Sequence, residues 1–567
     1  MLVRDKVAKF FAEALQLYRA RRLTEAAISC RRVLGLAPDH VNALHVLGRI
    51  AVETEQPAEA VAPLARAAKL QADNPALHAL LGTALLQLDR FEEAAAALET
   101  AVALNPGIAE AQCALGVALA RLEREEPAIA ACTAALKLNP DLVQAHFNLA
   151  NLYVQRRDTA GAIRHYREAL RLEPGNAFCH HRLGIGLSLE GHAEEALKHF
   201  RTAVRLQPNF VEAQNTLESV LVLAGRWEET VEQYELWVRA EPNSPEAHFD
   251  LGANLLMLGR YEEGWPHFEW RWQRAGNVPL QRHFRQPKWQ GEDLGQRSLL
   301  IHDEQGFGDA LQFCRYIPLM SQRCETVIFE TRAELLRLFR ANLETERVSV
   351  IPRVSGYPSV DGLPDTDFQI SLLSLPGILG TRVETIPAAV PYLKPDPADA
   401  RAWADRLAGL PRPRIALVWA GQPLYSKDKQ RSITLAQLAP LAQIPGLSFV
   451  SLQMGQARAE AATPPPGMVL DDFTGLLRDF ADSAALLSAV DLLITVDTSA
   501  AHLAGALGRP VWLLNRFLPD WRWLLKRDDS PWYPTLRQFR QPAPEEWDGV
   551  IARVAEALSA FAAAYRG

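Results

Sequence analysis

Small and apolar residues return every 34 residues through the first half of the chain. A leucine, followed in most units by glycine, recurs at Leu47, Leu81, Leu115, Leu149, Leu183, Leu217 and Leu251. In the same frame alanine recurs at Ala26, Ala60, Ala94, Ala128, Ala162 and Ala196, and proline at Pro38, Pro106, Pro140, Pro174, Pro208 and Pro242. Small residues let two antiparallel helices approach closely, and each proline ends a second helix before the next unit. The period predicts an α-solenoid of about eight helical hairpins over residues 1–275.

This pattern resembles the tetratricopeptide repeat. Stacked helix pairs of this kind form a superhelix with a concave groove, so the resemblance implies binding of an extended peptide or a partner protein. The alternative is a rigid arm that positions or dimerises the domain behind it. Asn148, Asn151 and Asn215 fall on first helices, where they are candidates for holding a bound backbone or for simple solvation.

The 34-residue period ends near residue 275. Residues 276–296 contain several prolines and glycines and are predicted to be a linker. An aromatic cluster lies just before it, and we expect this cluster to seal the array against the next domain. Its members are Trp265, Phe268, Trp270 and Trp272.

Short apolar runs separated by turns come after the linker. Residues 298–302 are predicted to form a buried strand, 303–308 a glycine-bearing turn, and 309–320 a helix. Gly306 and Gly308 allow a ligand to approach the backbone closely. The turn is neither a dinucleotide fingerprint nor a Walker A loop.

A second strand–turn–helix–strand unit covers residues 490–515. A buried strand over 492–496 is followed by Asp497, Thr498 and Ser499, which are good helix-capping residues. The free N–H groups at such a helix N-terminus favour an anion. We interpret the anion as the diphosphate of a sugar nucleotide; an ordinary crossover with a well-capped helix is the alternative.

A basic loop follows the strand predicted at residues 414–419. It carries Gly421, Lys427, Lys429 and Arg431. Cations at the carboxyl end of a strand suit a diphosphate leaving group, whose developing charge catalysis must stabilise. A solvated loop is the alternative.

Three segments, at residues 287–313, 414–421 and 496–512, carry a second resemblance. They look like the glycosyltransferase domain found behind tetratricopeptide repeats in many bacterial proteins, which is similar to the heptosyltransferases of glycosyltransferase family 9. The resemblance spans about residues 287–540. It implies an α/β GT-B fold of two facing Rossmann-like halves, and an inverting transfer that uses no metal and no cofactor besides the nucleotide-diphosphate sugar donor.

The same resemblance implies the domain boundaries. The N-terminal acceptor and catalytic half would cover residues 297–395 and the C-terminal donor-binding half residues 396–545. A terminal helix over 546–567 would pack back across the first half.

In the heptosyltransferases, the aspartate that ends the first glycine-bearing turn is the proposed general base, and that position is Asp309 here. Inverting transfer needs one carboxylate to take a proton from the acceptor hydroxyl. A carboxylate at a strand-to-helix turn faces the ligand crevice of such folds. Asp303 and Glu304 are rival bases in the same turn, and a helix-capping role is the alternative for Asp309.

The resemblance also implies donor-binding residues. The family pattern D-T-x-x-x-H is met by Asp497, Thr498 and His502, and a donor-binding lysine is either Lys427 or Lys429. We add Gly306, Gly308, Arg431 and Ser499 to the donor-binding set. No residue in 453–460 matches the family's nucleoside-binding acid, which leaves the nucleotide open. The aromatic and basic loop 519–534 is expected to hold the acceptor, or to form a lid or a core corner.

Composition narrows the class of protein. The net charge of −7, without a long block of one sign, argues against a nucleic-acid partner. No apolar run reaches the length of a membrane span, and the N-terminus lacks the pattern of a signal peptide. The six cysteines are scattered, so we expect reduced thiols, no metal site and a cytoplasmic location.

The sequence therefore predicts a glycosyltransferase that takes a nucleotide sugar and acts on a protein or glycan acceptor recruited partly by the repeats. Two alternatives stay open. One is a non-catalytic scaffold for protein–protein interaction with an inactive transferase domain. The other resembles the protein O-linked N-acetylglucosamine transferases, which also join such repeats to GT-B domains.

Overall fold

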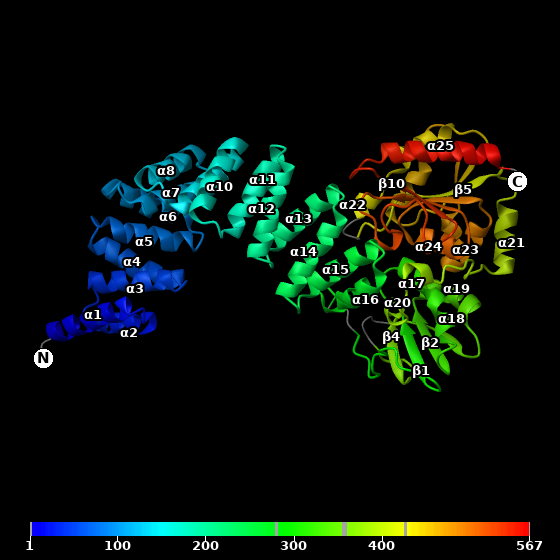
Figure 1. Ribbon diagram of the computed structural model, residues 1–567, viewed down its shortest axis with the longest axis horizontal. Helices are drawn as coiled ribbons and strands as arrows, with labels where there is room; N and C mark the ends of the chain where they lie inside the picture. The colour runs from blue at the N-terminus through cyan, green and yellow to red at the C-terminus, as the bar shows by residue number, and fades with distance from the viewer. Residues whose placement is uncertain (1–2, 278–281, 354–359, 425–427, 566–567) are drawn as a thin grey trace. The chain divides into compact units, whose positions relative to one another are not determined.

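A computed structural model describes residues 3–277, 282–353, 360–424 and 428–565. The chain divides into two compact units, Met1–Val220 and Leu221–Gly567. The first unit consists of paired antiparallel helices, drawn from blue to cyan in Figure 1. Its helices are α1 (Val3–Arg19), α2 (Leu23–Leu36), α3 (Val41–Glu53), α4 (Pro57–Leu70), α5 (Pro75–Leu86), α6 (Phe91–Leu104), α7 (Ala109–Arg121), α8 (Glu125–Leu138), α9 (Val143–Gln155), α10 (Thr159–Leu172), α11 (Ala177–Leu189), α12 (Ala193–Leu206) and most of α13 (Val211–Leu223).

The small residues of the repeat lie where two helices of a hairpin touch. A Cβ added at Gly48 would overlap Leu64, and one added at Gly82 would overlap Leu98. At Gly184 the same Cβ would come within 2.7 Å of the Phe200 ring. The recurring alanines from Ala26 to Ala196 are fully buried. The prediction that small residues permit close helix packing is therefore confirmed.

A left-handed residue ends the first helix of each hairpin. Positive φ angles occur at a spacing of 34 residues, at Arg21, Glu55, Asp89, Glu123, Arg157, Gly191, Gly225 and Gly259. Non-glycine residues rarely adopt this conformation. The repeat therefore imposes the turn on whichever residue occupies the position.

The second unit begins with the end of the helical array. Its helices here are α14 (Trp227–Ala240), α15 (Pro245–Met257), α16 (Tyr261–Phe268) and the short 3-10 helix η1 (Glu269–Gln273). Trp265 and Phe268 are buried and pack edge-on against Trp521, as expected for residues that seal the array. Trp270 instead stacks on His248 within the array.

A parallel sheet with the strand order β3-β2-β1-β4 comes next in the chain. Its strands are β1 (Ser298–His302), β2 (Thr326–Thr331), β3 (Val348–Pro352) and β4 (Phe368–Ser371). The helices around it are α17 (Phe307–Phe313), α18 (Ile317–Met320), α19 (Ala333–Leu343) and α20 (Leu375–Ile378).

Part of the predicted linker 276–296 pairs with the first sheet, because Lys288 forms a bridge with Gln369 of β4. The N–H of Trp289 donates to the Gln369 carbonyl at 2.9 Å, and the Trp289 side chain is buried. The Trp289 side chain is part of the hydrophobic core of this half. The proline and glycine content of the segment did not indicate such burial.

A second parallel sheet has the order β10-β9-β8-β5-β6-β7. Its strands are β5 (Arg414–Val418), β6 (Ser448–Ser451), β7 (Leu470–Asp472), β8 (Leu492–Val496), β9 (Val511–Asn515) and β10 (Leu536–Arg540). The helices of this half are α21 (Pro397–Arg406), α22 (Asp428–Arg431), α23 (Phe480–Ser488), α24 (Ser499–Ala506) and α25 (Asp548–Ala564). Helices α17 and α24 pack against each other, so the two halves meet there.

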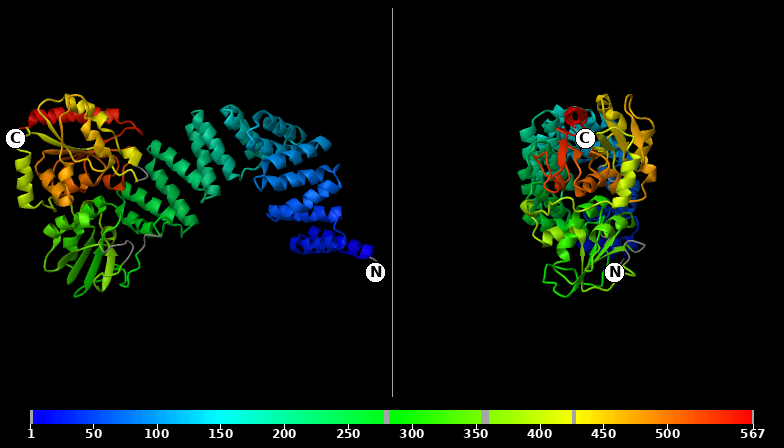
Figure 2. Two further views of the ribbon diagram at one scale, coloured as in Figure 1. Left: turned by 180° about the vertical axis from the view of Figure 1, so that it is seen from behind. Right: turned by 90° about the vertical axis from the view of Figure 1, so that its right-hand side faces the viewer.

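The terminal helix α25 covers the second sheet, and the expectation that it crosses the first half is wrong. Figures 1 and 2 show it in red along that sheet. Its apolar residues Val550, Val554 and Leu558 share a core with Trp512 of β9 and Phe539 of β10. Burial of this apolar face on the nearest open sheet surface decides its position.

Candidate functional site

Asp309 lies in the first turn of α17, directly after the turn that follows β1. One of its carboxylate oxygens accepts the N–H of Gly306 at 2.8 Å. The other forms an ion pair with Arg522 of the second half, and the Asp309 side chain is 15% exposed. Burial raises the pKa of Asp309, and the Arg522 guanidinium opposes that rise. Asp309 thus both caps its helix and faces the opposite half.

The two rival acids of this turn are enclosed by arginines. Asp303 is fully buried and is paired with Arg332 and Arg353. Glu304 is 2% exposed and is paired with Arg271 at 2.6 Å. Both carboxylates are shielded more completely than Asp309, which has its own arginine partner but is 15% exposed. Of the three acids, Asp309 is the most accessible.

Arg522 is the residue of this site that sequence reasoning missed. It lies in the loop after β9, where its guanidinium donates a hydrogen bond to the Asp520 carboxylate at 2.7 Å. Its guanidinium also stands over the Trp521 ring, 4.4 Å from the ring centroid. Only the alternation Trp521-Arg522-Trp523 in the sequence could have drawn attention to it, since arginine stacks on aromatic faces.

The rest of that loop is a core corner rather than an exposed aromatic surface. Trp523, Trp532 and Tyr533 are fully buried. Trp523 and Tyr533 pack against the His502 ring, and none of the three rings is available to stack on an acceptor.

His502, in α24, fills the space opposite Gly308. A Cβ added at Gly308 would come within 2.8 Å of the imidazole Cδ2. The imidazole Nδ1 is 2.9 Å from the Tyr533 hydroxyl, and the ring stacks on Trp523. Burial lowers the pKa of His502 to about 3, which keeps the ring neutral. The close approach that Gly308 permits is therefore to His502 of the second half.

The turn between β8 and α24 contains the predicted phosphate-binding residues. Thr498 precedes the helix, but its side chain does not cap the helix and lies 3.1 Å from the Thr495 hydroxyl. Ser499 begins the helix and is half-buried. Burial raises the pKa of Asp497, and the nearby carboxylate of Asp520 adds to the rise.

The basic loop contacts this turn through Arg431. Arg431 donates to the backbone carbonyl of Asp497 at 2.6 Å and pairs with Asp428 at 3.0 Å. Gly421 lies against the Arg431 guanidinium so closely that a Cβ there would overlap it. Lys429 is exposed, and Lys427 lies outside the described residues.

Charges of both signs therefore converge where the two halves meet. Arg522 interacts with Asp520, Asp309 and Asp497, and Asp497 in turn interacts with Arg431 and Arg516. The acids come from three separate segments, which follow β1, β8 and β9. The arrangement combines a partly accessible carboxylate with a helix N-terminus and several guanidinium groups.

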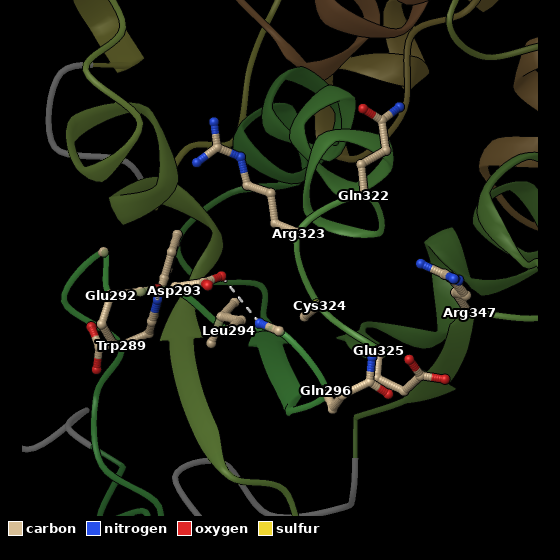
Figure 3. Close-up of a pocket in the computed structure, with 12 residues that line it drawn as sticks. Trp289, Glu292, Asp293, Leu294, Gln296, Gln322, Arg323, Cys324, Glu325 and Arg347 are labelled. Carbon is tan, nitrogen blue, oxygen red and sulfur yellow. Dashed lines mark hydrogen bonds between the residues drawn. The ribbon is translucent and has the colours of Figure 1, made fainter.

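A separate hollow of about 560 Å³ lies at the amino ends of the strands of the first sheet (Figure 3). Its lining includes Gln296, Glu325 and Arg347. These residues come just before β1, β2 and β3, so the hollow faces the amino ends of the strands. Ligands of parallel α/β sheets bind at the carboxyl ends. The hollow is distinct from the site around Asp309.

The described residues offer neither a metal cluster nor a membrane-spanning helix. No three or more metal-ligating side chains gather among them in a way that could hold a metal ion. No helix in the described part of the chain is long and apolar enough to cross a membrane.

Family models of the tetratricopeptide repeat match residues 79–143 and 143–176. A model for subunit 3 of the anaphase-promoting complex (cyclosome) matches residues 19–101. Among curated proteins, the chain is similar to protein FlbA of Caulobacter vibrioides, with 28% identity over 315 residues. The match covers 53% of this chain and 52% of FlbA, so the chain spans about half the length of that relative.

Several solved repeat structures are similar to part of the chain. YrrB, titled a TPR protein with an unusual peptide-binding site, is 17% identical over 34% of this chain and 98% of its own, with a TM-score of 0.29. PilF of Pseudomonas aeruginosa is 18% identical over 38% of this chain and 97% of its own, with a TM-score of 0.34. The family models show that the chain contains tetratricopeptide repeats, a class of repeat that binds peptides or proteins. In the structure two parallel sheets follow the repeats.

Proposed function

We propose that the chain is a glycosyltransferase of the family 9 type with a GT-B fold. It would move a sugar from a nucleotide-diphosphate donor to a protein or glycan acceptor, with inversion and without a metal ion. The repeats would recruit the acceptor in part. All six cysteines are buried and unpaired, which supports the cytoplasmic location that we propose with it.

The observation that carries this proposal is the position of Asp309. It is the least buried of the three acids in its turn, and it faces the second half through Arg522. In an inverting transfer, its carboxylate would take the proton of the acceptor hydroxyl as that oxygen attacks the anomeric carbon. Arg522 would favour the ionised form, which a base requires.

The leaving diphosphate would sit on the second half. The first-turn N–H groups of α24, with the hydroxyls of Thr498 and Ser499, are a suitable anion cradle. Arg431 adds a positive charge beside the turn, and Lys429 or Lys427 would complete it. Fixed charges of this kind stabilise negative charge that develops on the leaving group.

The test is donor binding and turnover by the full chain. ADP-, GDP-, UDP- and dTDP-sugars are screened by thermal shift, because a specific ligand stabilises the folded state by mass action. Substitution Asp309→Asn should then abolish transfer and leave donor affinity within about threefold, by the separation of catalytic and binding effects in mutant kinetics. Asp158→Asn is the control, because Asp158 also accepts a backbone N–H at a helix N-terminus, that of Gly161 in α10, but lies in the array. Full activity of Asp309→Asn would exclude Asp309 as the base.

The non-catalytic scaffold is the second candidate, because the family models match only repeat residues. It predicts no thermal shift with any nucleotide sugar and no turnover, together with retained binding of a peptide or protein by the repeats. A transferase of the O-linked N-acetylglucosamine type would instead bind a nucleotide sugar and modify serine or threonine hydroxyls.

A further inference from the structure

The last residues of the helical array reach the turn that carries Asp309. Arg271, in η1, is only 1% exposed although its guanidinium carries a positive charge. Its guanidinium donates to Glu304 at 2.6 Å and to the Ser374 hydroxyl at 2.9 Å. It also pairs with Glu269 at 2.6 Å. An arginine of the repeats therefore binds two elements of the first α/β half.

Glu304 has few polar partners other than Arg271. It is 2% exposed, and besides Arg271 it accepts a hydrogen bond from the Ser371 hydroxyl of β4. Burial raises the pKa of Glu304, and Arg271 opposes the rise. A buried carboxylate needs a partner of opposite charge with good geometry, and the planar fork of arginine provides one.

The backbone from Glu304 to Asp309 is short and strained at one point. Gln305, the residue after Glu304, has a φ of +57°, which non-glycine residues adopt only when their surroundings hold them there. Gly306 comes next, and its N–H is the one that Asp309 accepts. Anchoring Glu304 thus fixes one end of the segment whose other end is Asp309.

We propose that Arg271 is a positioning residue for Asp309, acting through Glu304 and the turn between them. The last helical hairpin then helps to position Asp309 of the transferase, in addition to any binding of partners by the repeats. The inference rests on the proposed function, because that function gives Asp309 its role.

Hydrogen exchange of the full chain tests the positioning without any assay of activity. Arg271→Met should speed exchange of the amides at 305–309 at least tenfold, and Arg271→Lys should fall between that variant and the wild type. Arg260→Met is the matched control, because Arg260 lies in the same hairpin and pairs with Glu263 and Glu228 of the array. Unchanged exchange at 305–309 in Arg271→Met would overturn the proposal.

A double variant covers the case in which Arg271→Met does not fold. Arg271→Met with Glu304→Gln removes both buried charges and should fold, yet keep the fast exchange at 305–309. Wild-type protection in the double variant would mean that Arg271 only neutralises Glu304, and the proposal would fail.

Kinetics form the second arm, measured as nucleoside diphosphate released from a donor sugar that the wild type uses. Arg271→Met should lower kcat at least tenfold with the donor KM within twofold, and Arg260→Met should change neither. An unchanged kcat would overturn the proposal. If the wild type uses no donor sugar, the proposed function fails, and the exchange experiment still decides whether Arg271 holds the turn.

Discussion

The charged pairs of the repeats and those of the α/β part differ in burial. In the array, Arg90 and Glu93 pair at 2.7 Å with side chains 44% and 59% exposed. In the α/β part, Arg282 and Glu330 pair with side chains only 2% and 0% exposed. Exposed pairs contribute little to stability, whereas a buried charge that loses its partner is costly. The same two residue types are therefore nearly neutral for stability in one region and a structural requirement in the other.

The two regions also differ in how far apart in the sequence their contacting residues lie. The array packs glycine and alanine between neighbouring helices, and each contact joins residues close in the sequence, such as Gly82 and Leu98. The α/β part joins distant segments, such as Asp309 and Arg522, which are 213 positions apart. All 13 tryptophans lie at or beyond Trp227, so tryptophan fluorescence reports on the second unit. The first unit, which has no tryptophan, and the second unit, which contains the α/β part, can therefore be followed separately in one chain.

The largest expected effect is the loss of a buried partner. Arg282→Met leaves Glu330 buried without its ion pair and should lower the free energy of unfolding of the α/β part by about 3–5 kcal/mol. Urea unfolding followed by tryptophan fluorescence measures it. The control Arg90→Met, followed by circular dichroism, should change stability by at most about 0.5 kcal/mol. Similar small effects at both sites would contradict the comparison.

Close helix packing in the array comes next. Gly82→Ala places a methyl group on Leu98 and should destabilise the first unit by about 1–3 kcal/mol. Gly35, in α2, has no atom within 4 Å of an added Cβ. Gly35→Ala should therefore stabilise the helix by up to about 1 kcal/mol. Thermal unfolding followed by circular dichroism compares the two, and equal shifts would show that close packing is not the cause.

The buried His502 predicts a pH dependence. Its pKa is lowered to about 3 by burial, whereas an unfolded histidine has a pKa of about 6.5. Below pH 6.5 the unfolded chain binds a proton that the folded chain does not, so stability falls as the pH falls. From pH 7 to pH 5, the wild type should lose about 2 kcal/mol more than His502→Gln. Parallel losses in both proteins, measured by urea unfolding, would mean that His502 is protonated in the fold.

The smallest effect concerns the left-handed turns. Glu123 has a φ of +57°. Glu123→Gly removes the steric cost of that conformation but adds freedom to the unfolded chain, so the net gain should be at most about 1 kcal/mol. Gly191→Ala, at the equivalent position two repeats later, should change stability in the opposite direction. Differential scanning calorimetry of the two variants checks the sign, which should reverse between them.

Much of the fold was predictable because local patterns determine it. The strand predicted over 492–496 is β8, and the helix predicted to follow it is α24, since an apolar run and capping residues mark both. The segment after the basic loop, Leu435–Gln443, has the apolar spacing of an α-helix but forms a 3-10 helix that contains Pro440. Proline removes a backbone donor, and apolar spacing alone does not show that.

The candidate site was predictable only in part. Asp309, Asp497 and His502 were singled out in separate segments, and the structure brings all three to the junction of the two halves. Arg522 and Arg271 were not singled out, because the partners that connect them to the site, Asp309 and Glu304, lie 213 and 33 positions away in the chain. Asp303 and Glu304 could be set apart from Asp309 only when their arginine partners were visible.

The sequence by itself determined the repeat, its period and the close packing within each helical hairpin, because these depend on neighbours within one 34-residue unit. It also identified two strand-to-helix turns as candidate catalytic and donor-binding sites. Only the tertiary structure decided which acid stays accessible, which arginine faces it and which hairpin supports it. Those outcomes depend on the burial of charges that must find partners across long stretches of chain, and no local pattern encodes that pairing.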